Sequence, residues 1–490
     1  MEGLKNIVNS LNKREIALVR LLYSHKSNAE ESYRLKLFEL IKKSKDLDDK
    51  KARDNIYKGK TLSAFSHLKK RLQNDILNII QFQETTKKFR TRIATVSVEV
   101  KKMIVFSEIL YKRGLTDEGD SIIYDGIKLA DKYELPAEEY ILTEMQRIRH
   151  GYTKGDKTIN QFKKKIEKCV NEIKINADSI GIYYDLSVKN QFKSNQSVEE
   201  LKNQELQIKN LHKNFISSKI AKNGFWYYSA EMYHHNRQNN FEKAVEYGLK
   251  LAELIKNNAS IGSAVQIATV NKEISEIYIA SSKYAVAIPH ANESLTNLNP
   301  ALNNYLLTLE TLFYPHFYLG QYIEAEEVLK RAIAHPRFWT RKITFTRWNY
   351  FSACLEFARG NYKKCNELLR NDSKNLLADK GELQLGFRLL TIMLMVETGK
   401  EDLLEYELDS FRKSFVTIKN YKLDRIKLIQ KILASLNREG WHFAKIQKKE
   451  ADKFELLKTD AKCLWQPLGF ELIQFEKWIE AAIKREESMI

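Results

Sequence analysis

The sequence predicts an all-α protein in which helix pairs stack side by side into an α-solenoid. The chain has 490 residues with only 6 Pro and 18 Gly, and 43% of its residues are hydrophobic. Its apolar residues recur at intervals of three and four positions, which is the period of an amphipathic helix and not of a strand. A pattern of turn, aromatic residue and small residue also returns along the second half of the chain, as stacked helix pairs require.

The repeated pattern can be aligned on aromatic positions that we call anchors. The anchors are Phe241, Tyr284, Tyr322 and Tyr362, with Asp402 at a fifth position where the aromatic residue is lost; the spacings are 43, 38, 40 and 40 residues. Three residues after the anchors stand Ala244, Ala287, Ala325, Cys365 and Glu405. Gly320 and Gly360, and Gly399 with Lys400, mark the turn before an anchor. We expect this alternation because each helix pair can bury its apolar face only against its neighbours.

This arrangement resembles the tetratricopeptide repeat (TPR), most clearly in FYLGQYIEAEEVLKRAI, from Phe317 to Ile333. In that family a small residue closes the turn between two helices, an aromatic residue fills the seam, and alanines let the helices approach. The resemblance covers residues 222–415 well and 98–215 weakly. The spacing departs from the family's usual period of about 34 residues, and the tryptophan and paired glycine positions of its first helix are mostly absent.

We divide the chain into four parts. Residues 1–97 form a basic helical N-terminal module, 98–215 degenerate helical repeats, 216–420 the TPR-like repeats and 421–490 a helical C-terminal cap. The degenerate part is predicted to contain helices near 98–113, 116–133, 137–151, 157–174, 177–191 and 197–214. We expect the cap because a repeat array needs terminal helices with one polar face to stop stacking.

Positive charge is concentrated in the N-terminal module. The formal net charge is +18, and residues 1–100 hold 22 Lys and Arg against 12 Asp and Glu, a balance of +10. Its first predicted helix has a capping pair, Asn12 and Glu15. A later amphipathic helix begins near Leu62, and the candidate contacts to phosphate or to an acidic partner are Lys69, Lys70 and Arg71 on its polar face and Lys87, Lys88, Arg90 and Arg92 beyond it. The alternative is an ordinary solvated face, and no helix-turn-helix signature supports DNA binding.

The TPR resemblance implies a concave groove lined by the first helix of each pair. Counting back from the anchors carries the groove positions onto Trp226, Tyr233, Asn236, Arg237, Lys272, Tyr314, Phe317, Tyr318, Arg347 and Tyr350. Aromatic and cationic side chains together are typical of a binding surface. The alternative is that these aromatic residues pack between neighbouring helices.

The sequence offers little sign of catalysis, and we expect no enzyme activity, cofactor or metal. It has no P-loop, dinucleotide fingerprint, HExxH, GxSxG or EF-hand loop. The four cysteines form no CxxC pair and are predicted to be buried thiols. The N-terminus lacks the apolar region of a signal peptide, and no apolar run is long enough to span a membrane, so we expect a cytoplasmic protein.

Two functions from different classes remain. The first is a non-catalytic scaffold or adaptor whose groove binds a peptide or protein partner, of acidic or C-terminal carboxylate character to suit Arg237, Lys272 and Arg347. The second is a nucleic-acid-associated regulatory protein, in which the basic N-terminal module contacts phosphates and the repeats bind a partner or act as a sensor.

Overall fold

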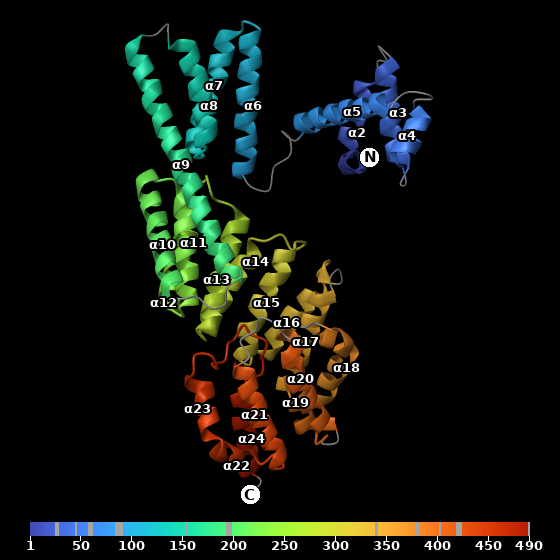
Figure 1. Cartoon of the computed structure of the whole chain (residues 1–490), viewed down its shortest axis with the longest axis vertical. Coiled ribbons are helices and arrows are strands. Elements are labelled where there is room, and N and C mark those ends of the chain that lie inside the picture. Colours follow the sequence, from blue (N-terminus) through green and yellow to red (C-terminus); the bar gives the residue numbers. More distant parts are fainter. Residues whose placement is uncertain are drawn as a thin grey trace. The chain divides into compact units, whose positions relative to one another are not determined.

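The computed structural model describes residues 1–24, 29–44, 47–56, 62–83, 92–151, 155–192, 198–338, 342–378, 382–400, 403–417 and 424–488. Within these ranges the chain forms 24 α-helices and no strand, which confirms the predicted all-α class (Figure 1). The chain divides into two compact units, residues 1–173 and 174–490, with the boundary inside one long helix.

The first unit begins with the N-terminal module. Its helices are α1 (Glu2–Ser10), α2 (Lys13–Leu22), α3 (Ala29–Lys43), α4 (Asp49–Ile56) and α5 (Leu62–Gln83). They enclose a separate apolar core that includes Val8, Phe38 and Leu72. The predicted capping pair is confirmed, since the Asn12 side chain accepts from the Glu15 amide at 3.0 Å and the Glu15 carboxylate accepts from the Asn12 amide at 2.7 Å.

Three consecutive antiparallel helices follow in the first unit. They are α6 (Arg92–Lys112), α7 (Thr116–Lys132) and α8 (Pro136–His150), and α9 (Asp156–Phe192) comes next. Val100, Ile123 and Leu142 bury their side chains in a common core. The prediction of two helices at 157–174 and 177–191 is wrong, because α9 is continuous through both. No Gly or Pro stands between the two predicted helices, so nothing there stops a helix from continuing.

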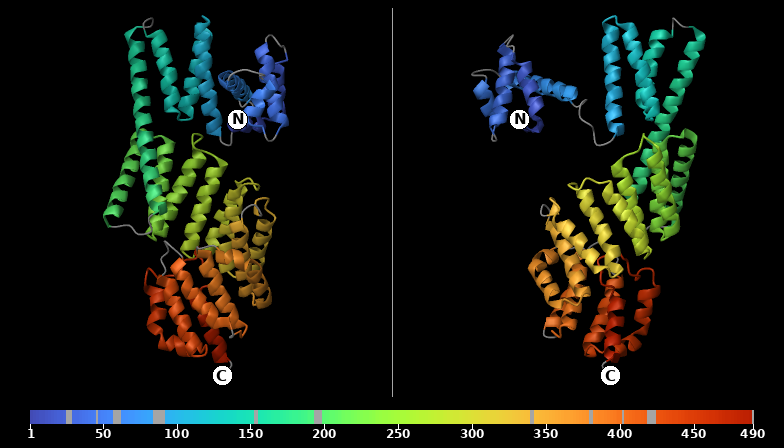
Figure 2. Two further views of the ribbon diagram at one scale, coloured as in Figure 1. Left: turned by 45° about the vertical axis from the view of Figure 1, so that its right-hand side comes forward. Right: turned by 180° about the vertical axis from the view of Figure 1, so that it is seen from behind.

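The second unit contains the described helices after α9, and the helix pairs are among them. They are α10 (Val198–Ser218), α11 (Ala221–Arg237), α12 (Phe241–Asn257), α13 (Ala264–Ala280), α14 (Tyr284–Thr296), α15 (Asn303–Tyr318), α16 (Tyr322–Ile333), α17 (Lys342–Ala358), α18 (Tyr362–Ala378), α19 (Glu382–Glu397), α20 (Leu404–Thr417), α21 (Asp424–Arg438), α22 (Phe443–Lys449), α23 (Ala451–Thr459) and α24 (Phe475–Ser488). From α10 to α21 each helix packs against the next along the chain, and further views show the antiparallel hairpins (Figure 2). This sequential packing confirms a TPR-like α-solenoid.

One turn geometry closes every pair from α11 to α20. The residue two positions before each anchor adopts the left-handed backbone conformation. The φ angles of Asn239, Ser282, Gly320 and Gly360 are 58°, 58°, 71° and 77°. The next amide then donates back to the carbonyl five residues earlier, as in Gln321 to His316 at 2.9 Å. This 6→1 bond is that of a Schellman motif, which satisfies the last carbonyls of the first helix.

The anchors mark the first residues of the second helices. Phe241, Tyr284, Tyr322 and Tyr362 begin α12, α14, α16 and α18, and the small residues three positions later, Ala244, Ala287, Ala325 and Cys365, are all buried. The fifth predicted anchor is out of register by one position. Gly399 has φ 63°, which places the anchor at position 401, outside the described residues as Asp402 is. Leu404, and not the exposed Glu405, then fills the seam.

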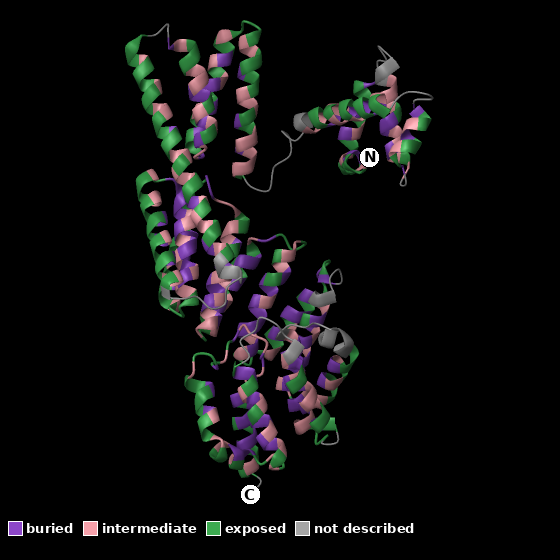
Figure 3. Ribbon diagram, in the orientation of Figure 1, coloured by how far each residue is buried: buried purple, intermediate pink, exposed green. Residues whose placement is uncertain are grey.

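The C-terminal helices share one core with the preceding repeats. This core joins Phe313 and Phe351 to Ile429 and Phe475. Burial is concentrated on α11 and around α21, whereas α10 is largely exposed (Figure 3). Between α23 and α24, residues 460–474 form no helix. We call them the covering segment, because they pack on the first helices of the last repeats.

A buried ion cluster fixes the covering segment. The Arg425 guanidinium binds Glu471 at 2.8 Å and Glu476 at 2.6 Å, and it also donates to the carbonyl of Cys463 at 2.7 Å. Glu471 accepts in addition from the Phe475 amide at 2.7 Å, at the start of α24. The cluster therefore ties α21 to both ends of the region that leads into the last helix.

Two predictions about the whole chain can be compared with the structure. All four cysteines are buried free thiols, as expected. In the described part of the chain, no helix is both long enough and apolar enough to cross a membrane.

Candidate functional site on the first helices

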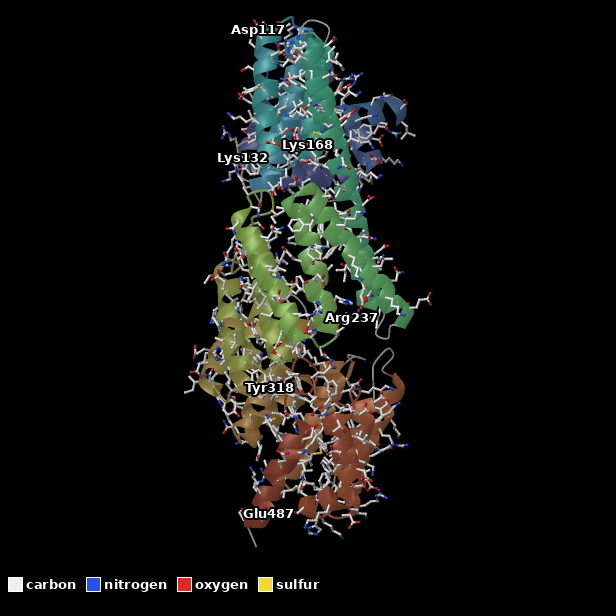
Figure 4. All side chains as sticks on the ribbon, turned by 90° about the vertical axis from the view of Figure 1, so that its left-hand side faces the viewer. Asp117, Lys132, Lys168, Arg237, Tyr318 and Glu487 are labelled. Carbon is white, nitrogen blue, oxygen red and sulfur yellow. The ribbon has the colours of Figure 1, made fainter. Side chains whose placement is uncertain are left out.

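The candidate site is one face of the first helices, which we call the first-helix wall. It consists of the residues 4, 8, 12 and 15 positions before each anchor and their neighbours on α11, α13, α15 and α17. Figure 4 labels two of its members, Arg237 at the end of α11 and Tyr318 at the end of α15. Side chains from successive first helices contact one another along this wall.

On α11 and α13 the wall is partly open to solvent. Trp226, Tyr233 and Asn236 are half-buried, and Arg237 is exposed. The Trp226 ring packs 4.7 Å from the Tyr183 ring of α9. These residues remain predicted partner contacts, since they lie on the predicted face and are accessible.

A half-buried carboxylate joins α11 to α13. The Tyr233 hydroxyl donates to the Glu273 carboxylate. Burial raises the pKa of Glu273 to about 7; the Tyr233 hydrogen bond opposes this rise and the nearby Glu276 charge adds to it. Glu273 therefore changes charge near neutral pH, in the open part of the wall.

Ion pairs continue the wall from α13 to α17. Lys272 binds Glu276 at 2.5 Å, and Glu276 also accepts from the Thr311 hydroxyl at 3.1 Å. Arg347 of α17 binds Glu310 of α15 at 2.7 Å. Two of the three predicted cations are thus paired with carboxylates of the wall itself. To bind Lys272 or Arg347, an acidic partner would have to displace the carboxylate of Glu276 or Glu310.

Further along, the predicted groove is not open, and three residue predictions are wrong. Tyr314, Phe317 and Tyr350 are 3%, 6% and 2% exposed, so they do not line an accessible groove. Phe313 and Phe351 pack beside them with ring centroids 5.0 Å apart. Aromatic packing between neighbouring helices, the alternative raised from the sequence, is what the structure shows for these residues.

The covering segment lies on the wall at α15 and α17 and also contacts α19. The Tyr318 hydroxyl donates to the carbonyl of Pro467 at 2.6 Å, and the Tyr350 hydroxyl donates to the carbonyl of Phe470 at 2.8 Å. The Trp465 ring lies edge-on to Tyr318 at 5.2 Å. At Gly386 the segment passes so close that a Cβ would stand 2.3 Å from the Phe470 carbonyl oxygen.

A cavity lies at the open end of the wall. It has a volume of about 440 Å³, and α9, α10 and α11 contribute its lining residues. Tyr233, Asn236 and Arg237, three of the predicted groove residues, lie together there. The structure thus brings part of the predicted site to one cavity and buries or covers another part.

Sequence reasoning missed the contributions of α9, Glu273 and the covering segment. Tyr183 lies in the weakly matching repeats, so no anchor pointed to it. Glu273 stands one turn from Glu276, a spacing that was available as a signal. Pro467 disfavours a continuous helix at this point of the chain, but the sequence held no sign of which helices the covering segment packs on.

The predicted N-terminal contacts divide into three groups. Lys69 binds Asp49 at 2.6 Å, and Asp49 also binds the N-terminal ammonium at 3.3 Å. Lys70, Arg71 and Arg92 are exposed, and the Arg92 guanidinium lies 3.4 Å from the Tyr133 hydroxyl. Lys87, Lys88 and Arg90 lie outside the described residues. In the described part of the chain, no group of three or more His, Cys, Asp and Glu side chains could hold a metal ion.

The helix pairs, the repeated turn and the anchors define a TPR-like α-solenoid. No protein-family model and no curated protein matches the sequence. Among solved structures it is similar to a signal transduction ATPase with numerous domains (STAND) with a tetratricopeptide repeat sensor from Pyrococcus horikoshii, at 15% identity and a TM-score of 0.45. That alignment covers 88% of this chain, and this chain spans 66% of the length of that one.

Proposed function

We propose that this protein is a non-catalytic scaffold that binds an extended segment of a protein partner on the open part of the first-helix wall. The observation that carries the proposal is the covering segment. It shows that tyrosine hydroxyls of this wall can hold a non-helical segment through main-chain carbonyls, at Pro467 and Phe470. Recognition through main-chain groups with side chains in pockets is a general mode of peptide binding.

The open stretch from α11 to α13 offers the same kinds of groups without a covering segment in the described residues. Trp226 and Tyr233 supply ring surface, and Asn236 and Arg237 supply donors at the end of α11. Aromatic side chains give large contact area at modest entropic cost, and an arginine can bind a carboxylate with two hydrogen bonds. A partner segment with an aromatic residue and a carboxylate suits this stretch best.

Site-specific photo-crosslinking in native lysate tests the proposal. A benzophenone amino acid is placed at Asn236 or at the exposed Thr269, both on the wall, and adducts are identified by mass spectrometry. We expect both positions to capture the same partner through one contiguous segment. Matched controls stand on second helices at Leu249 and Ile323, which are 46% and 74% exposed. Equal capture of that partner at the control positions, or different partners at the two wall positions, would contradict the proposal.

A second candidate function rests on the N-terminal module. The module has its own apolar core, and Lys70 and Arg71 are exposed on α5. The candidate is a nucleic-acid-associated regulator whose module contacts phosphates. Binding driven by phosphate contacts falls linearly with the logarithm of salt concentration, whereas capture on the aromatic wall should survive moderate salt. Titration of a duplex DNA and of a structured RNA against increasing KCl therefore separates the candidates.

A further inference from the structure

The C-terminal cap holds a group of three cations between α21 and α23. We call Lys431, Arg438 and Lys453 the cap cluster. Lys431 and Arg438 are exposed on α21, and Lys453 comes from α23, which packs on α21 and has a largely exposed outer face (Figure 3). Leaving out the buried Arg425, residues 424–459 hold 8 Lys and Arg against 5 Asp and Glu. The cap cluster therefore lies in a locally basic part of the molecule.

One carboxylate is shared by the cap cluster. The Arg438 guanidinium donates to the Ser435 hydroxyl at 3.3 Å, and this hydroxyl donates to Glu450 at 2.7 Å. The Lys453 ammonium binds the other carboxylate oxygen of Glu450. Among the described residues, no carboxylate lies within ion-pair distance of Lys431 or Arg438. Three positive charges thus share one negative charge.

The cations of the cap cluster repel one another. Burial lowers the pKa of Lys453, and the charges of Lys431 and Arg438 lower it further. The four positions that lie three or four residues from Lys431 on α21 hold no Asp or Glu, so no neighbour on its own helix can neutralise it. A bound anion would relieve this repulsion, because a nearby opposite charge favours the charged form of an ammonium group.

The spacing and composition of the cap cluster favour the phosphates of a nucleic-acid duplex. Lys431 and Arg438 are about 10 Å apart along α21, at 1.5 Å per residue. One DNA strand carries a phosphate about every 3.4 Å of duplex axis, so this distance spans several phosphates. Lysine is depleted in protein–protein interfaces, whereas protein–DNA interfaces are strongly positive. The cluster has no aromatic ring on which an unpaired base could stack, which favours a duplex over a single strand.

We propose that the cap cluster binds the phosphate backbone of a nucleic-acid duplex without reading its sequence. Lys431 and Arg438 supply the main contacts, and Lys453 adds to them although Glu450 holds part of its charge. Contacts of this kind position a protein on a duplex and carry no sequence information. The proposal goes beyond the scaffold function and does not rest on it. It is also separate from the second candidate function, whose cations lie in the N-terminal module.

Fluorescence anisotropy of a labelled DNA duplex with the full chain, over a series of KCl concentrations, tests the proposal. Each phosphate contact contributes about −0.9 to the slope of the logarithm of affinity against the logarithm of salt concentration. Lys431→Gln combined with Arg438→Gln should therefore reduce the magnitude of this slope by about 1.8. The matched control is Lys445→Gln combined with Lys449→Gln, which removes the same charge from the same cap. Both control lysines bind Glu439 at 2.6 Å, so the slope should change much less.

Glu450→Gln tests the proposal in the opposite direction. It removes the one carboxylate of the cap cluster, and the freed Lys453 should tighten duplex binding about fivefold. Poly-L-glutamate and vesicles that contain phosphatidylserine are the competing probes. Absence of duplex binding, an equal change of slope in the two double variants, or dependence on the cluster only for poly-L-glutamate or vesicles would overturn the proposal. Because these titrations contain no protein partner, their outcome is separate from that of the crosslinking experiment.

Discussion

The first-helix wall differs sharply between α11–α13 and α15–α17. At the position eight residues before the anchor, Tyr233 and Glu276 are partly accessible, whereas Tyr314 and Cys354 are buried. The repeats share one turn and one anchor register, so neither of these makes the difference. On the second stretch, aromatic rings of neighbouring helices pack against one another, and the covering segment, more than 100 residues away in sequence, lies on Tyr318 and Tyr350.

The comparison shows that position within a repeat does not decide whether a residue can bind a partner. Tyr318 and Tyr350 use their hydroxyls on the chain's own carbonyls, at Pro467 and Phe470. The covered stretch is therefore part of the buried core of the second unit. The open stretch keeps polar and aromatic groups at the surface, and it carries the proposed scaffold function.

The largest effect is expected from removal of the cation that ties down the covering segment. Arg425→Met leaves Glu471 and Glu476 buried without a positive charge, and such a loss costs about 3–5 kcal/mol. Hydrogen exchange should increase strongly in peptides from residues 460–474 and stay unchanged in peptides from α11. Equal acceleration of hydrogen exchange in both regions would show that the two stretches open together.

The same change can be compensated if its physical cause is correct. The triple variant Arg425→Met, Glu471→Gln, Glu476→Gln removes the uncompensated charges and should recover much of the loss, because replacing all members of a buried ion cluster is often nearly neutral. A triple variant as unstable as the single one would mean that guanidinium packing, and not charge, fixes the segment.

A smaller effect is expected where the covering segment touches α19. In Gly386→Ala the new Cβ would stand 2.3 Å from the Phe470 carbonyl oxygen and 2.5 Å from the Tyr350 hydroxyl. The segment must move, at a cost of about 1–3 kcal/mol. Thermal denaturation measures the loss. The matched control is Gly181→Ala on α9, where nothing lies within 4 Å, and which should stabilise its helix by up to about 1 kcal/mol.

How far the sequence could predict these features depends on how far apart in the sequence the interacting residues are. The anchors at Tyr322 and Tyr362 predicted the pairs because turn and seam are local and repeat with the same chemistry. Asn239 and Ser282 could have been recognised as turn residues only by the register of the other anchors, since both adopt the conformation that Gly usually supplies. The burial of Tyr350 depends on a contact 120 residues away, and no periodic pattern encodes that pairing.

The open stretch should respond to pH through Glu273. Its folded pKa of about 7 lies above the ordinary value of a glutamate near 4.3. The folded state therefore holds the proton more tightly, and this stabilisation is complete below about pH 4 and is lost as pH rises through 7. Glu273→Gln should remove about 2–3 kcal/mol of pH-dependent stability between pH 5 and 8. Denaturation at several pH values measures the slope, and an unchanged slope would exclude Glu273 as its source.

The smallest effect is expected from a single hydroxyl at the edge of the covering segment. Tyr318→Phe keeps the ring against Trp465 and removes the 2.6 Å hydrogen bond to the Pro467 carbonyl. A lost hydrogen bond of this kind costs about 1 kcal/mol, so hydrogen exchange near residue 467 should rise modestly. Tyr284→Phe is the control, because its hydroxyl makes only a 3.3 Å exposed contact to Ser282. If Tyr318→Phe changes nothing, ring packing alone holds the segment, and hydroxyl donation is no guide to how the open stretch binds a partner.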